Sequence, residues 1–216
     1  MNANPPGIPK RVSDRENRQR EHWIADRLIF ALASHGQIAF PIERRLRDKP
    51  DCCFDAGGRT IGLEISELVP TALRDAEVLQ ETVYPHARVH PSDFPWGKEW
   101  TEKDLHAFLA RGGSLHPRGW AGDEEERALA GNANERLALK TKKLNGEGFD
   151  RYGENWLGLY ASYHPPHLHF EALATALCDP RTVADQPVQF DRLLLLAGDS
   201  LVMAPYVVFQ APTPWT

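Results

Sequence analysis

Two carboxylates face each other across an expected hairpin. Asp51 opens a short strand predicted over residues 51–54, and Glu64 lies in the middle of a strand predicted over residues 59–66. The residues between these strands, Asp-Ala-Gly-Gly at 55–58, are typical of a tight turn, so the two side chains can converge. Paired carboxylates supply the hard oxygen ligands that Mg²⁺ or Mn²⁺ prefers, and such an ion activates water and stabilises charge on a phosphate. The pair therefore predicts a divalent-metal site.

The second of these strands alternates between two kinds of side chain. One face carries Gly62, Glu64 and Ser66, whereas the residues between them are apolar and should pack on a helix. Because a buried sheet rarely tolerates a carboxylate without a partner, Glu64 requires a cation or a hydrogen-bond donor nearby.

The segments that carry the two carboxylates resemble the signature of a known family. Lys49-Pro50-Asp51, together with Gly-Arg-Thr-Ile-Gly-Leu-Glu-Ile-Ser at 58–66, is similar to the motif of the PD-(D/E)xK nuclease superfamily, which has the restriction-endonuclease-like fold. The resemblance implies hydrolysis of phosphodiester bonds with Mg²⁺ or Mn²⁺, in DNA rather than RNA. It implies Asp51 and Glu64 as metal ligands and the backbone carbonyl of Ile65 as a further ligand. A homodimer is also an expectation, because many members work as dimers.

The chain departs from that motif at its last position, where Ser66 replaces the family's lysine. The lysine orients or deprotonates the attacking water and supports the phosphate, which a serine at this catalytic position cannot do alone. Lys140 and Lys143 share one face of a long helix expected over residues 123–144 and are the natural substitutes. The alternative is a catalytically degenerate protein that serves as a binding or accessory module. Both interpretations stay open.

Other residues have types that could assist or bind a metal. Glu21 lies on the stripe of the first helix that faces the sheet, and first-helix acids assist the metal in some members of the superfamily. An ion pair with an arginine is the favoured alternative for Glu21. His164, His167 and His169 stand close enough in sequence to bind zinc, but a proline-rich turn with surface histidines is the favoured interpretation.

Three tryptophans lie in or beside expected loops. Trp96, Trp100 and Trp120 could stack on the bases of a single strand. Side chains of this kind more often seal the edge of a core, and that is the interpretation we favour.

The expected elements form one α/β domain over residues 13–216, after a flexible N-terminal arm over residues 1–12. Helices are expected over residues 13–34, starting at a capping box of Ser13 and Glu16, and over 71–83, 101–111, 123–144 and 168–178. Strands are expected over residues 38–46, 51–54, 59–66, 156–163, 191–197 and 201–209. The order predicts a mixed central sheet flanked by helices. It resembles a restriction-endonuclease-like αβββαβ core with a helical insertion at about 84–122.

The composition is that of an ordinary globular chain, with 42% hydrophobic residues and a formal net charge of −5. The overall charge does not point to nucleic acid, although basic residues cluster locally, as at Arg44, Arg45 and Arg47. No apolar run approaches the roughly 18 residues that cross a membrane, and the first residues lack the apolar core of a signal peptide. We therefore expect no membrane association and a cytoplasmic location. The three cysteines argue against a disulfide framework.

Overall fold

The structure is a computed structural model, which describes residues 14–39, 41–115, 119–162, 168–183, 186–204 and 207–210. The helices are α1 (Asp14–Ser34), α2 (Thr71–Thr82), α3 (Glu102–Ala110), α4 (Glu124–Leu144) and α5 (Phe170–Ala176), with short 3-10 turns η1 (Pro91–Asp93) and η2 (Pro180–Thr182). The strands are β1 (Arg44–Leu46), β2 (Cys52–Ala56), β3 (Arg59–Leu68), β4 (Glu154–Ala161), β5 (Arg192–Ala197), β6 (Ser200–Ala204) and β7 (Val207–Gln210).

The strands form one mixed sheet whose spatial order follows the chain from β1 to β7. The central strands β3, β4 and β5 are parallel to one another. On one side β1 and β2 continue the sheet with antiparallel pairing, and on the other side β6 and β7 do the same. A parallel neighbour needs a crossover connection, which α4 and α5 provide. The prediction of a mixed α/β sheet with an antiparallel start and a parallel addition is confirmed.

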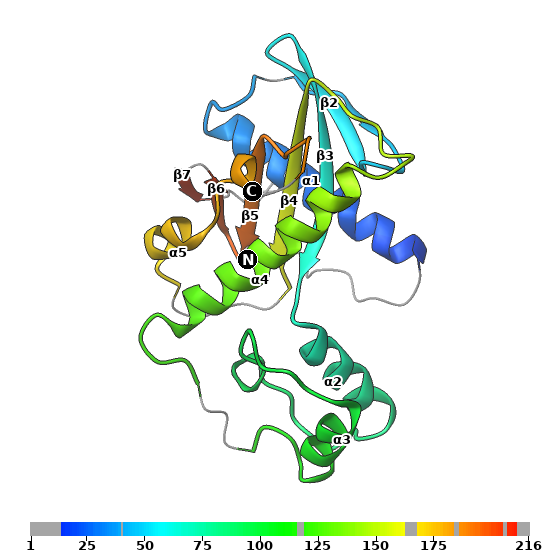
Figure 1. Cartoon of the computed structure of the whole chain (residues 1–216), viewed down its shortest axis with the longest axis vertical. Coiled ribbons are helices and arrows are strands. Elements are labelled where there is room, and N and C mark those ends of the chain that lie inside the picture. Colours follow the sequence, from blue (N-terminus) through cyan, green and yellow to red (C-terminus); the bar gives the residue numbers. More distant parts are fainter. Residues whose placement is uncertain are drawn as a thin grey trace, which may run out of the picture.

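Helices cover both faces of this sheet, with α4 crossing in front and α1 lying behind (Figure 1). The alternation of β3 separates the two layers. Its odd-numbered residues Ile61, Leu63 and Ile65 pack with the apolar stripe of α1, as the sequence predicted. The even-numbered face, which carries Glu64, is turned toward α4.

A small helical lobe extends below the sheet between β3 and α4 (Figure 1). It has its own hydrophobic cluster, in which Leu73 and Ala76 of α2 pack with Phe94 and Leu105. The lobe therefore includes α2 as well as the insertion predicted at about 84–122. The helix α3 begins at a capping box between Thr101 and Asp104, which fixes its first turn.

Two predicted strands are wrong in extent. The strand expected over 38–46 contains Pro41, which has no N–H to donate to a ladder, and only Arg44–Leu46 is paired. The strand expected over 201–209 contains Pro205 and is divided into the antiparallel strands β6 and β7. The other element boundaries differ from the prediction by about two residues, as is usual at frayed ends. The N-terminal arm and Ser13 of the predicted capping box lie outside the described residues.

Candidate metal-dependent active site

The β2–β3 hairpin brings Asp51 and Glu64 together. Gly57 and Gly58 form its two-residue turn with positive φ angles, and the ladder pairs Cys52 with Leu63. One residue further along this register, Asp51 stands opposite Glu64. The side chain of Asp51 is fixed there, because its Oδ2 accepts a hydrogen bond from the backbone N–H of Ile65 at 2.6 Å. The convergence that the sequence predicted is therefore present.

A lysine from α4 reaches the same site. The Lys140 Nζ lies 2.5 Å from Glu64 Oε1, and the two side chains are only 14% and 10% exposed. Lys143, one turn further along the helix, is exposed. Of the two lysines proposed from the sequence, the structure brings Lys140 to the carboxylates and leaves Lys143 on the surface.

The electrostatics show how closely the acidic groups are placed. Burial, together with the negative charges of Glu64 and Glu21, raises the pKa of Asp51 to about 7, against the opposing effects of the Ile65 N–H and Lys140. Glu21 of α1 contributes to this effect through its charge, which is smaller in influence than that of Glu64.

The residues at hand fit a small divalent cation held mainly by two carboxylates. Mg²⁺ usually binds through one or two carboxylates and keeps several waters, and it suits a site where two acids share one positive partner. Among the described residues, no three His, Cys, Asp or Glu side chains are grouped as a metal site. A cation held by Asp51 and Glu64 would need further ligands from backbone carbonyls, such as that of Ile65, and from water. Ser66 is half-buried on the Glu64 face, two residues beyond it.

The contact of Tyr152 with the strand pair was not predicted from the sequence. The ring of Tyr152 covers Gly62, where an added Cβ would lie 2.6 Å from the ring and 3.0 Å from Pro50. Gly62 is thus the position that lets the loop before β4 close over the strand pair. A glycine in the middle of a strand is a recognised sign of such close approach, and it is the signal that could have predicted this contact.

The basic clusters of the N-terminal half are largely engaged with acids. Arg44 forms an ion pair with Asp26 at 2.8 Å, and Arg45 with Asp55 at 2.7 Å. Glu67, on the α1 face of β3, pairs with Arg20 at 3.3 Å. These residues stabilise the fold around the site.

The structure describes only one of the three histidines that were considered for zinc binding. The backbone N–H of His169 donates to Glu126 Oε1 at 2.7 Å, which ties the start of α5 to α4. His164 and His167 lie outside the described residues.

The tryptophans behave differently from one another. Trp100 packs on Phe94 and Phe108, with ring centroids 5.0 and 5.5 Å away, so the prediction that it seals a core is confirmed. Trp96 is 50% exposed, and for it that prediction is wrong. Its ring rests on α4 at Gly131, outside any of the three clusters.

Comparison with known proteins adds no relative, since no family model, curated protein or solved structure matches the chain. No helix in the described part of the chain is long and apolar enough to span a membrane.

Proposed function

We propose that the chain is a divalent-metal-dependent phosphodiester hydrolase of the PD-(D/E)xK type, acting on DNA. Asp51 and Glu64 hold Mg²⁺ or Mn²⁺, with the Ile65 carbonyl as a further ligand, and Lys140 replaces the lysine missing at Ser66. The observation that carries the proposal is the contact of Lys140 with Glu64, beside Asp51. A lysine from another element supplies the cation at the place where the motif lacks it.

The order of elements supports the same proposal. Leaving out the helical lobe, the chain runs α1, β1, β2, β3, α4, β4, an αβββαβ order of the kind that the resemblance implies. In this arrangement the lobe is an insertion between β3 and α4. The carboxylates stand on the strand pair and the lysine on the helix that crosses it, so rigid elements position all three groups.

The chemistry is the attack of water on phosphorus. The water oxygen bonds to phosphorus and loses a proton, while the bond to the leaving ester oxygen breaks and that oxygen gains a proton. The bound cation supplies Lewis acidity for the phosphate charge. Lys140 can donate a hydrogen bond to a phosphate oxygen or to the attacking water while Glu64 holds it in place.

A second candidate follows from the same ion pair. Lys140 already neutralises Glu64, which is what a purely structural pair between a strand and a helix would do. In this alternative the protein is a catalytically degenerate member of the fold that acts as a binding or accessory module. It predicts no Mn²⁺ binding at Asp51 and Glu64.

Cleavage of plasmid and of single-stranded DNA in Mn²⁺ separates the two candidates. The proposal predicts cleavage that stops with EDTA and is lost in Glu64→Gln. Isothermal titration of Mn²⁺ into the wild type and into Glu64→Gln gives a second readout. Cleavage that survives in Glu64→Gln, or identical Mn²⁺ isotherms for both proteins, would contradict the proposal.

A further inference from the structure

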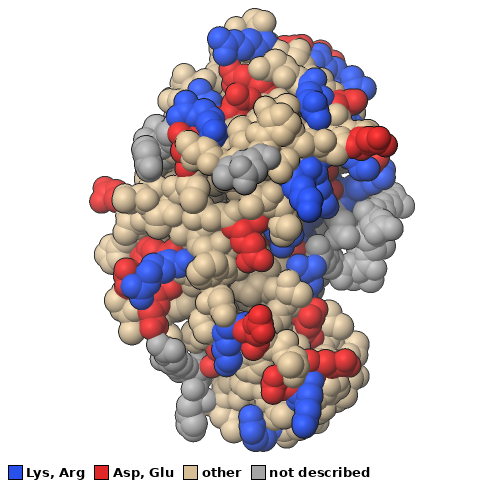
Figure 2. All heavy atoms as spheres, viewed as in Figure 1, with Lys and Arg blue, Asp and Glu red and all other residues tan. Residues whose placement is uncertain are grey.

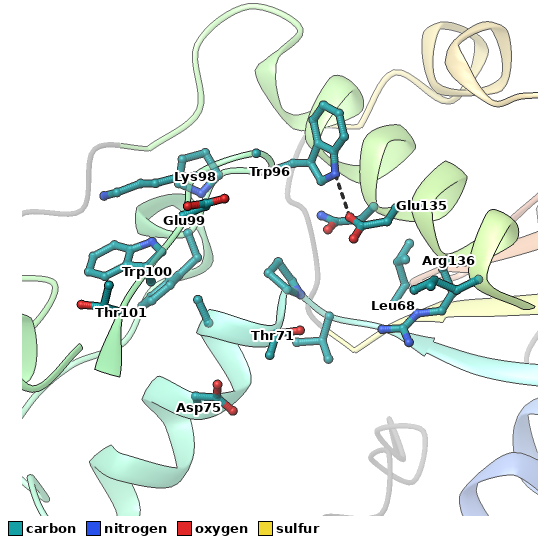
Figure 3. A pocket seen from close by; sticks show the side chains of 18 residues that line it. Leu68, Thr71, Asp75, Trp96, Lys98, Glu99, Trp100, Thr101, Glu135 and Arg136 are labelled. Carbon is teal, nitrogen blue, oxygen red and sulfur yellow. Dashed lines mark hydrogen bonds between the residues drawn. The ribbon is translucent and has the colours of Figure 1, made fainter. Parts of the chain in front are cut away.

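A cavity of about 490 Å³ lies between the helical lobe and α4. It opens beside Leu68, the last residue of β3, so it shares that strand with Glu64. Figure 3 shows Trp96, Glu135 and Arg136 on one side of it, the segment from Lys98 to Thr101 on the other, and Thr71 between them. Its volume lies within the range of sites that hold a small organic ligand.

Trp96 forms a flat and pre-organised wall of this cavity. An added Cβ at Gly131 would lie 2.4 Å from the indole, so the ring rests directly on the backbone of α4. The indole N–H donates to Glu135 Oε2 at 3.3 Å, one helical turn further on. Half of the side chain nevertheless remains exposed. A ring held on one side and open on the other is suited to stacking on a planar group.

Arg136 connects this cavity to the proposed active site. It lies one turn before Lys140 on α4, a rise of about 6 Å along the helix. Figure 3 shows its guanidinium pointing toward the space between Thr71 and Leu68. A strand with one phosphate at Lys140 can therefore place a neighbouring phosphate at Arg136.

The remaining charges restrict the kind of ligand. Asp75 and Glu99 line the cavity together with Arg136, so it is not a purely basic site for phosphate. On the face shown in Figure 2, Lys and Arg side chains alternate with Asp and Glu, and the described residues form no continuous basic track for a duplex backbone there. Carboxylates can accept hydrogen bonds from the exocyclic amino group of a base. The mixture fits one nucleotide better than a polyanionic duplex.

We propose that this cavity binds one unpaired nucleotide, with its base stacked on Trp96 and a phosphate at Arg136. The preferred substrate is then single-stranded DNA or a frayed end, threaded between the lobe and α4 toward Glu64. The direction in which the DNA strand is threaded, toward Glu64, rests on the proposed function. The binding of the nucleotide itself does not require cleavage.

The test is fluorescence anisotropy of a labelled single-stranded oligodeoxynucleotide, measured in EDTA so that nothing is cleaved. A fully abasic strand of equal length and charge is the comparison. We expect the wild type to bind the strand with bases on the order of tenfold more tightly than the abasic strand, which is the usual effect of one stacked base. A duplex of the same sequence should bind more weakly than the single strand.

Matched variants locate the site. Trp96→Ala should abolish the preference for bases. Trp120→Ala should keep it, because Trp120 lines only the neighbouring cavity of about 480 Å³, whereas Trp96 lines both. Arg136→Gln should weaken both strands alike. If Trp96→Ala does not fold, Gly131→Ala keeps the tryptophan but displaces its ring, and it should reduce the preference.

Three results would overturn the inference. They are equal binding of both single strands by the wild type, a preference that persists without Trp96, and a duplex that binds as tightly as the single strand. A preference for bases without any Glu64-dependent cleavage would support this binding site and overturn the proposed nuclease, so the two failures can be told apart.

Discussion

Replacing Asp51 with asparagine should make the folded protein more stable at neutral and alkaline pH. Asparagine has the same shape, and its amide oxygen can still accept the hydrogen bond from the Ile65 N–H. The substitution removes only the negative charge, which lies partly buried beside Glu64. A site arranged for a cation holds that charge at a cost to stability when the cation is absent.

The pKa of Asp51 gives the size and the pH range of the effect. The carboxyl has an ordinary value of 3.8 in the unfolded chain and about 7 in the folded protein. Between these values the folded protein keeps a proton that the unfolded chain has lost, so wild-type stability falls as the pH rises from about 4 to about 7 and is then constant. The full penalty is on the order of 4 kcal/mol. Because an amide is a weaker acceptor than a carboxylate, we expect a gain of about 2 to 4 kcal/mol for Asp51→Asn above pH 7.

Urea unfolding followed by tryptophan fluorescence measures this difference across the range from about pH 4 to about pH 8, in EDTA. Asp55→Asn is the matched control on the same hairpin. Hydrogen bonds from Arg45 and Thr60 lower the pKa of Asp55 to about 2 in the folded protein. The stability that ionised Asp55 contributes is therefore complete at a pH above its pKa in the unfolded chain, and it is lost only as the pH falls toward 2. Asp55→Asn should therefore be less stable than the wild type by an amount that stays constant across this range.

A stability difference between Asp51→Asn and the wild type that does not change with pH would contradict this prediction. It would mean that burial and Glu64 do not raise the pKa of Asp51 in the folded protein.

Three further predictions concern the same site. Lys140→Met should lower stability at neutral pH by about 3 kcal/mol, because it leaves Glu64 buried without its ion-pair partner, and adding Glu64→Gln should recover most of that loss in the same urea assay. Mn²⁺ at about 100 times its dissociation constant should stabilise the wild type by about 3 kcal/mol at pH 8, and Asp51→Asn should lose this effect. Gly62→Ala should cost about 1 to 3 kcal/mol by overpacking against Tyr152, and it should weaken the stabilisation by Mn²⁺ because the site must shift.

Two of these substitutions have a matched control in the chain. Lys143→Met removes an exposed lysine from the same helix and should leave stability nearly unchanged. Gly153→Ala places a Cβ 3.5 Å from the Thr60 carbonyl, an ordinary contact, so it should be milder than Gly62→Ala. A loss for Lys143→Met equal to that for Lys140→Met, or equal losses for both glycines, would count against the geometry described. Stabilisation of Asp51→Asn by Mn²⁺ to the wild-type extent would place the cation elsewhere.

The strand pair could be predicted from the sequence because its signals are local. The alternation of β3 and the two glycines of its turn determine both the faces of the strand and the register, and the register places Asp51 opposite Glu64. For the lysine that replaces the one missing at Ser66, the sequence identifies two candidates and does not distinguish between them. Lys140 and Lys143 are separated by a single helical turn, and only the rotation of α4 over the sheet decides which one reaches Glu64.

The parts that could not be predicted depend on contacts between distant segments. Tyr152 covers Gly62 from a loop about ninety residues away, and nothing near either residue in the sequence indicates their pairing. Trp96 was expected to seal a core, because the sequence does not show that Gly131 offers its ring a flat resting place on α4. The division of the last predicted strand between Ala204 and Val207 could have been inferred, since the sequence has a proline in this segment and a proline cannot donate to a ladder.

We propose that Lys140 serves a metal site formed by Asp51 and Glu64. The single-turnover rate of single-stranded DNA cleavage in Mn²⁺ tests this for Lys140→Met and Lys143→Met, with Glu64→Gln as the background. We expect a rate lowered by about 10²- to 10⁴-fold in Lys140→Met, a wild-type rate in Lys143→Met, and no cleavage above background in Glu64→Gln. Equal rates for the two lysine variants, or wild-type cleavage by Glu64→Gln, would contradict it.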